Sequence, residues 1–262
     1  MPPFTPQLSL HLSTLIGVAV LAALYLYAIG PWRRLRDFPK PEWWRPVCYV
    51  GALLVIAVSL NGPIHDLSDR YLFWVHMAQH LLLTLVMPPL LILGLPGWLV
   101  DGWTARRQDG KSALVSILRL LTHPVFAGIL FAAVLLAWHA VGAYDLMMRE
   151  HGVHIATHLM FMVAAVLFWW PVVSASTLLP RLGPGLGMLY LFLGQLPMQI
   201  LGAIITFAEE PLYTWYLAAP RTWGMSPLDD QKLGGLLMWV PGNLWIWGAM
   251  SVLFFQWAKK ER

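Results

Sequence analysis

The sequence predicts an all-α membrane protein, a polytopic bundle of about seven transmembrane helices. Hydrophobic residues make up 58% of its 262 residues and charged residues only 11%, whereas soluble domains average about 25% charged residues. The apolar residues are grouped into stretches near the length that a bilayer crossing requires, roughly 20 residues. Because the connections are short and no repeat is evident, we expect residues 1–262 to form one transmembrane helical domain.

Seven apolar stretches are the candidate spans, and the second of them is the shortest. They are Leu10–Gly30, Pro46–Leu60, Tyr71–Leu95, Pro124–Tyr144, Gly152–Val172, Gly185–Ala208 and Leu233–Trp257. The residues ahead of the first, MPPFTPQLSL, include no basic residue, so we expect a tail leading into a span rather than a cleaved signal peptide. Pro88 and Pro89 should kink the third span, because neither has the N–H that a helix uses.

Lysine and arginine predict the orientation. One side of the bundle would carry 13 of them, in the first, third and fifth connections and the C-terminal tail: Arg33, Arg34, Arg36, Lys40, Arg45, Arg106, Arg107, Lys111, Arg119, Arg181, Lys259, Lys260 and Arg262. The other side would carry four: Arg70, Arg149, Arg221 and Lys232. Basic residues concentrate in cytoplasmic loops. We therefore predict the N-terminus outside and the C-terminus in the cytoplasm.

Two histidine pairs lie inside the apolar stretches, His76/His80 in the third and His154/His158 in the fifth. A spacing of four residues places both imidazoles of a pair on one helix face. At 1.5 Å per residue, these histidines and His139 of the fourth stretch lie roughly 3–14 Å below the outer ends of their spans. Ionisable side chains at membrane depth are costly and mark functional sites. The pattern predicts a metal or haem site in the outer leaflet.

The side chains at that depth favour copper. Imidazole suits copper, zinc and iron, and a thioether adds a preference for Cu(I). Cys48 is the only cysteine, which excludes thiolate motifs. The candidate metal ligands are His76, His80, His139, His154, His158, Met198 and Met238. The alternative is that each histidine separately bonds a backbone carbonyl or a neighbouring helix, and for His11, His65 and His151 we expect this structural role.

Other features have weaker interpretations. The carboxylates Asp66, Asp145 and Asp230 fall near the histidine layer. Asp229 and Asp230 are loop carboxylates, a cap for the seventh span, or partners of a metal-bound histidine. The aromatic-rich connection 209–232 is an interfacial or re-entrant segment or an ordinary loop on the headgroups. Nothing resembles a nucleic-acid-binding face, a phosphate loop, a nucleophile elbow or a zinc-protease motif.

Three stretches together resemble the CtaG family of cytochrome c oxidase assembly factors, the polytopic type associated with caa-type oxidases. They are FWVHMAQHLLLTLVMPPLLILGLP at 73–96, HGVHIATHLMFMVAAVLFWWPV at 151–172 and SPLDDQKLGGLLMWVPG at 226–242. The resemblance extends over nearly the whole chain. It implies maturation of a haem–copper oxidase in the bacterial plasma (inner) membrane, by delivering copper to the catalytic subunit or by assembling it.

The leading hypothesis is thus a non-enzymatic assembly factor that holds copper transiently in an outer-leaflet layer of His and Met. Two rivals remain open. One is a haem-binding membrane cytochrome, in which two histidines from facing helices ligate haem axially. The other is a metal-free membrane scaffold for oxidase assembly.

Overall fold

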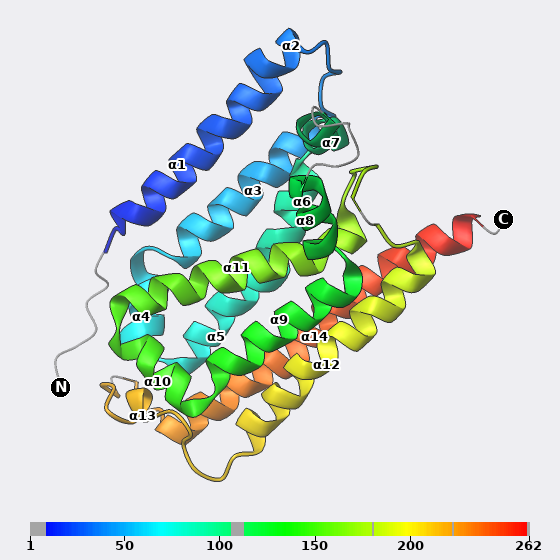
Figure 1. The fold of residues 1–262 in the computed structure, drawn as a ribbon. Coiled ribbons are helices and arrows are strands. Elements are labelled where there is room, and N and C mark those ends of the chain that lie inside the picture. Colours follow the sequence, from blue (N-terminus) through cyan, green and yellow to red (C-terminus); the bar gives the residue numbers. More distant parts are fainter. Residues whose placement is uncertain (1–8, 106–112, 180, 222, 261–262) are drawn as a thin grey trace.

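The computed structural model describes residues 9–105, 113–179, 181–221 and 223–260, and within these ranges the chain forms helices and no strand (Figure 1). Arg106, Arg107, Lys111 and Arg262 of the orientation prediction lie outside the described residues. The all-α prediction is confirmed.

Five helical stretches are long and apolar enough to cross a membrane unaided. The first is α1 (Leu12–Tyr27), which continues through a π-helical turn η1 (Ala28–Trp32) into α2 (Arg33–Leu35). The third predicted span consists of α5 (Phe73–Leu81), the π-helical turn η2 (Leu82–Val86) and α6 (Met87–Gly94). The other three are α11 (His151–Val173), α12 (Pro184–Phe207) and α14 (Pro227–Lys260).

Two bent helix pairs bring the candidate spans to seven, as predicted. They are α3 (Trp44–Ser59) with α4 (Gly62–Arg70), bent by 47°, and α8 (Ala113–Leu121) with α9 (Pro124–His139), bent by 64°. Gly62 explains the first bend, because its φ of +63° is a left-handed conformation that glycine adopts without strain. Pro124 explains the second, because the residue before a proline disfavours the helical conformation, and His123 is extended.

Short helices lie at the ends of the spans: α7 (Gly97–Ala105), α10 (Val141–Arg149) and α13 (Thr214–Leu217). The predicted fourth span, Pro124–Tyr144, thus ends at His139, where a break leads into α10. The predicted third span remains one helix, and the π-helical turn η2 directly precedes the α6 turn that holds Pro88 and Pro89. A proline in the first turn of a helix lacks only an N–H that has no intrahelical partner.

The tight pairing of α12 with α14 depends on small residues. A Cβ atom added at Gly202 would lie 3.1 Å from the carbonyl oxygen of Gly235, and one added at Gly235 would lie 2.7 Å from the backbone nitrogen of Thr206. Such close backbone approach is typical of helix pairs in membranes. The pair forms one side of the bundle, and α14 also packs on α5.

Figure 1 places α2, α7 and the C-terminal turn of α14 at one end of the bundle, and α4, α10 and α13 at the other. The basic residues of α2 and of the last turn of α14 are therefore at the same end, as the predicted orientation requires. How the bundle is oriented in its membrane stays a prediction.

Helix α1 is peripheral. It packs against α3, and Tyr25 is its only buried side chain. The Tyr25 ring stacks on Tyr49 of α3 at 3.9 Å, and its hydroxyl donates to the carbonyl oxygen of Gly94 at 2.9 Å. Two more hydrogen bonds tie α1 to its neighbours: the Tyr49 hydroxyl donates to the carbonyl oxygen of Leu21 at 3.2 Å, and the backbone N–H of His11 donates to the Asn61 side chain at 2.8 Å.

Candidate metal centre

The two histidine pairs face each other across the α5–α11 interface. His76 and His80 extend from α5, and His154 and His158 from α11. All four side chains are buried. The ring centroids of His76 and His154 are 5.6 Å apart, and those of His80 and His158 are 5.3 Å apart. The structure thus brings together all four paired histidines, which the sequence placed at similar depth.

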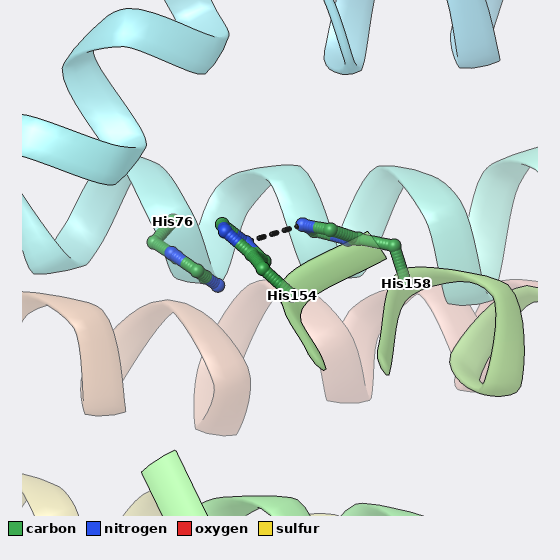
Figure 2. Close-up of side chains that lie close together, drawn as sticks. All are labelled: His76, His154 and His158. Atoms are coloured by element: carbon green, nitrogen blue, oxygen red, sulfur yellow. Dashed lines mark hydrogen bonds between the residues drawn. The ribbon is translucent and has the colours of Figure 1, made fainter. Parts of the chain in front are cut away.

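Three of them form a candidate metal site. Figure 2 shows His76 pointing from one helix towards His154 and His158 on the other. Each can offer a ring nitrogen such that all three nitrogens lie within 4.8 Å of one another. A metal with three nitrogen ligands at about 2.0 Å in one plane holds those nitrogens about 3.5 Å apart. Small rotations of the imidazoles would bring them to that distance, so the residues present fit a metal ion.

Tyr216 fixes which nitrogen of His76 carries hydrogen. Burial raises the pKa of Tyr216 well above its ordinary value, so its hydroxyl keeps one hydrogen to donate. The hydroxyl donates this hydrogen to the carbonyl oxygen of Ser68 at 2.5 Å. It then accepts from Nδ1–H of His76, which lies 3.1 Å away. Nε2 of a neutral His76 is consequently an unprotonated lone pair, the form that binds metals.

Asp69 lies beside His154 and His65. A carboxylate oxygen of Asp69 lies 3.6 Å from Nδ1 of His154 and 3.3 Å from Nε2 of His65. The distance to His154 is longer than a hydrogen bond, so this contact does not fix which nitrogen of His154 carries hydrogen. A carboxylate near a ligating histidine is a common arrangement around metals in proteins.

Within each pair the two Nε2 atoms are in hydrogen-bond contact. Nε2 of His80 lies 2.9 Å from Nε2 of His76, and Nε2 of His158 lies 2.8 Å from Nε2 of His154. Because Nε2 of His76 is unprotonated, His80 is the donor in the first contact. Nδ1 of His80 and Nδ1 of His158 are both buried with no hydrogen-bond partner. An unsatisfied buried polar atom costs free energy, typically about 1–3 kcal/mol.

His139 is a fifth member of the cluster. Its Nδ1 donates to the carbonyl oxygen of Leu135 at 2.8 Å, and its Nε2 is buried without a partner. Its ring centroid lies 5.9 Å from that of His80. The structure therefore places His139 beside the pair on α5, with its ligand nitrogen free.

The two predicted methionine ligands lie in the α12–α14 pair. Met198 and Met238 are both buried, in the same apolar core as Phe161 and Met147. The thioether of Met198 packs near Gly242, since a Cβ atom added there would lie 3.0 Å from its terminal methyl group. Their role as copper ligands stays a prediction.

Asp230 positions the helix that carries His76 and His80. It is fully buried, and its two carboxylate oxygens accept from the backbone N–H groups of Phe73 and Trp74 at 3.1 and 3.0 Å. These are the first residues of α5, so a residue of α14 caps a different helix. Arg221 neutralises the carboxylate at 2.9 Å. Asp230 therefore caps a helix, which is one of the roles considered for it, but it caps the third predicted span and not the seventh.

The aromatic connection after α12 covers the outer end of the cluster. Tyr213 and Tyr216 are each 3% exposed. Tyr213 donates to the carbonyl oxygen of His139 at 3.1 Å, and Trp215 donates to that of Asp69 at 2.8 Å. Asp145 accepts from Thr214 at 2.5 Å and so holds α13 against α10. The segment therefore covers the histidines, and its position relative to the headgroups stays a prediction.

Sequence reasoning missed Asp69 and the role of Tyr216. For Asp69 a signal was present, since it follows His65 by four residues and so shares a helix face with it. Asp66, the carboxylate we favoured on that helix, is buried too, but neither ion pair of the histidines involves it. Tyr216 is 140 positions from His76, and no local pattern links them.

Comparison with known proteins places the chain in a family. A family model described as cytochrome c oxidase caa3 assembly factor matches residues 23–260. Uncharacterized proteins of Mycobacterium bovis and Mycobacterium tuberculosis are each 28% identical over 203 residues, 73% of this chain and 31% of the relative. An uncharacterized protein of Mycobacterium leprae is 26% identical over 260 residues, 95% of this chain and 39% of the relative.

The chain thus spans well under half the length of these curated relatives. No solved structure matches it. The family match, by contrast, includes every helix that carries a clustered histidine. The protein belongs to the family of cytochrome c oxidase caa3 assembly factors.

Proposed function

We propose that this protein assists the assembly of a haem–copper cytochrome c oxidase by holding Cu(I) at the histidine cluster and passing it to the catalytic subunit. The observation that carries the proposal is the site of His76, His154 and His158, whose ligand nitrogens lie within 4.8 Å of one another inside the bundle. The hydrogen bond from Nδ1 of His76 to Tyr216 leaves Nε2 of His76 unprotonated, and a metal would replace the contact that this nitrogen makes with His80.

The donor set favours Cu(I) over a divalent ion. The three ligands are neutral imidazoles in a buried site, and moving a charge out of water costs more as the charge rises. A monovalent ion accepts a small number of nitrogen or thioether ligands, whereas catalytic zinc usually keeps a water in its fourth position. His80 and His139, with Met198 and Met238, offer further ligands for stepwise release.

The packing around the imidazoles argues against haem. The His80 ring contacts Phe161 at a centroid distance of 4.8 Å, and the His76 ring lies 5.7 Å from Tyr144. These aromatic rings occupy the space beside the imidazoles that a porphyrin would need. A metal-free scaffold is less favoured, because it would leave three imidazole nitrogens buried and unsatisfied for no gain.

The family and the apolar helices support a role in a membrane. We place the protein in the bacterial plasma membrane, with the cluster in its outer half. Its partner would be the catalytic subunit of the oxidase, and its action would be metal transfer, not catalysis.

The test has two parts: copper binding by the purified protein, and maturation of the oxidase in cells. We expect wild-type protein loaded anaerobically with Cu(I) to retain copper by elemental analysis, and a His76→Ala/His154→Ala variant to lose it. Cells that carry the variant should accumulate oxidase deficient in copper, and added copper should restore part of its activity. His123→Ala is the matched control, because that imidazole is exposed and lies outside the cluster. Wild-type protein that binds no Cu(I) would overturn the proposal.

A further inference from the structure

An apolar groove leads from the side of the bundle to the histidine cluster. It lies between α1, α3 and α11 and has a volume of about 270 Å³. Its walls include Gly17 of α1, Ile56 of α3 and Leu159 of α11. Two histidines also line it, His65 and His158. The groove therefore joins the lipid-facing surface to one member of the candidate metal site.

The histidine in the groove wall is the one best placed to exchange ligands. His158 belongs to the three-histidine site, and its Nδ1 is buried without a hydrogen-bond partner. His65 is held by Asp69 and Gln79, at 3.3 and 3.2 Å. The inner end of the groove thus contains an unsatisfied imidazole beside a satisfied one.

One wall of the groove, α1, buries little of its own surface. Within the span that begins with α1, only 6% of the most apolar window is buried. A Cβ atom added at Gly17 would meet nothing within 4 Å, so this face of α1 leaves open space in the groove. The residues of α1 that line the groove end at Leu21, about one helical turn before Tyr25, where the carbonyl oxygen of Leu21 accepts from the Tyr49 hydroxyl at 3.2 Å.

The aqueous side of the cluster is, in contrast, covered. Tyr216 contacts His76 directly, Trp215 is bonded to α4, and Arg221 is paired with the buried Asp230. A ligand arriving from that side would have to displace these buried hydrogen bonds, and an unmade buried hydrogen bond is costly.

We infer that copper leaves this cluster sideways, through the groove between α1 and α11, to a thioether carried on a transmembrane helix of the partner protein. The inference rests on the proposed function. A bare or hydrated copper ion would be costly in an apolar groove. The acceptor must therefore bring its own ligand into the groove, and an apolar helix with one such side chain meets both requirements. Transfer is then an exchange of ligands on Cu(I), with no change of oxidation state.

The test uses full-length protein in lipid vesicles, loaded anaerobically with Cu(I). Two chelators remove the copper: bathocuproine, which partitions into the bilayer, and its disulfonate, which stays in water. We expect bathocuproine to extract copper at least about tenfold faster, since only it can enter an apolar groove without a desolvation cost. Gly17→Trp, which fills the groove, should remove most of that advantage without changing the copper content. Leu159→Trp fills the groove from the α11 side and guards against a folding defect in the first variant.

Gly248→Trp is the matched control. Gly248 also has no atom within 4 Å of an added Cβ, but it lines a different groove of about 400 Å³ beside Arg181 and Trp245. This variant should release copper like wild type. A second arm supplies a leucine-rich transmembrane peptide with two methionines at outer-leaflet depth, and a peptide with leucine in their place. Only the methionine peptide should gain copper, and Gly17→Trp should block the gain.

Three results would overturn the inference. The first is equal extraction by the two chelators, and the second is unchanged extraction from both groove-filling variants. The third is fast bathocuproine extraction with no transfer to the methionine peptide, which would assign the groove to a lipid acyl chain. Wild-type protein that takes up no copper is a different failure, since it overturns the proposed function as well.

Discussion

The two helical stretches α5–α6 and α11 contain opposite kinds of interior in the half that carries the histidines and in the other half, which we call outer and inner after the predicted orientation. In the outer half, imidazoles from α5 and α11 lie against one another, and Nδ1 of His80 and of His158 have no partner. In the inner half the two stretches meet through apolar residues, including Ile92 and Phe168. Each stretch runs from one half into the other, through the π-helical turn η2 in the case of α5–α6, and the side chains distinguish the two interiors.

Most inner-half polar groups near this interface are satisfied. Thr84 donates to the carbonyl oxygen of His80 at 2.6 Å, and Trp169 donates to that of Thr84 at 3.0 Å. Tyr190 donates to the carbonyl oxygen of Phe168 at 2.9 Å. The indole nitrogen of Trp170 is buried without a partner. The outer half is distinguished by three unsatisfied imidazole nitrogens in one cluster, those of His80, His139 and His158, as a binding site requires.

The largest expected difference between the halves concerns copper affinity. His154→Ala removes one of the three proposed ligands. Substituting a residue that only supports a metal ligand typically weakens metal binding by about 10–100-fold. We therefore expect the loss of a ligand to raise the Cu(I) dissociation constant by more than about 100-fold. Thr84→Val in the inner half should leave it unchanged. Competition with a chromophoric Cu(I) chelator measures both. Equal affinities in the two variants would remove the distinction between the halves.

Tyr216 tests whether a hydrogen bond to one of the clustered histidines affects copper affinity. Tyr216→Phe keeps the ring but removes the acceptor for Nδ1–H of His76, so we expect about 10–100-fold weaker Cu(I) binding. Tyr190→Phe removes a hydroxyl of the inner half and is the matched control. If the two variants bind copper equally well, Tyr216 does not set the tautomer of His76.

Asp230 tests how the histidine helix is positioned. Asp230→Ala removes the cap of α5, which typically costs about 1–2 kcal/mol, and leaves Arg221 unpaired. The midpoint of thermal unfolding in detergent should fall, and copper affinity should fall with it because α5 frays near His76. Asp229→Ala is the control, since that carboxylate is exposed and bonds only Ser226 in its own turn. An unchanged midpoint for Asp230→Ala would contradict its role as a cap.

The smallest effect is expected in the inner half. Trp169→Phe removes one buried hydrogen bond, worth about 0.5–1.5 kcal/mol, and leaves the carbonyl of Thr84 without that donor. Stability should fall slightly, with no change in copper binding by chelator competition. A loss of copper in this variant would show that the halves are coupled.

The sequence predicted those parts of the structure that depend on local pattern. Hydropathy located the spans, and the spacing within each histidine pair placed both imidazoles on one helix face. The bend at Gly62 had a local signal, Asn61-Gly62-Pro63, which is typical of a turn, but the second span was predicted to end there. The π-helical turn before Pro88 had no such signal.

The contacts that set the chemistry of the site join distant segments. Asp230 caps a helix more than 150 positions earlier in the chain. Trp215 bonds Asp69 across 146 positions. These contacts exist only once α14 packs on α5 and the connection after α12 folds over α4. A single sequence, read for periodicity, does not specify them.

X-ray absorption spectroscopy of the Cu(I)-loaded protein tests the central claim most directly, that imidazoles of the outer half hold copper. We predict a first shell of three nitrogens at about 2.0 Å, with the multiple-scattering signature of imidazole, and one nitrogen fewer in His76→Ala. A first shell composed of sulfur, or a spectrum that His76→Ala leaves unchanged, would contradict the assignment.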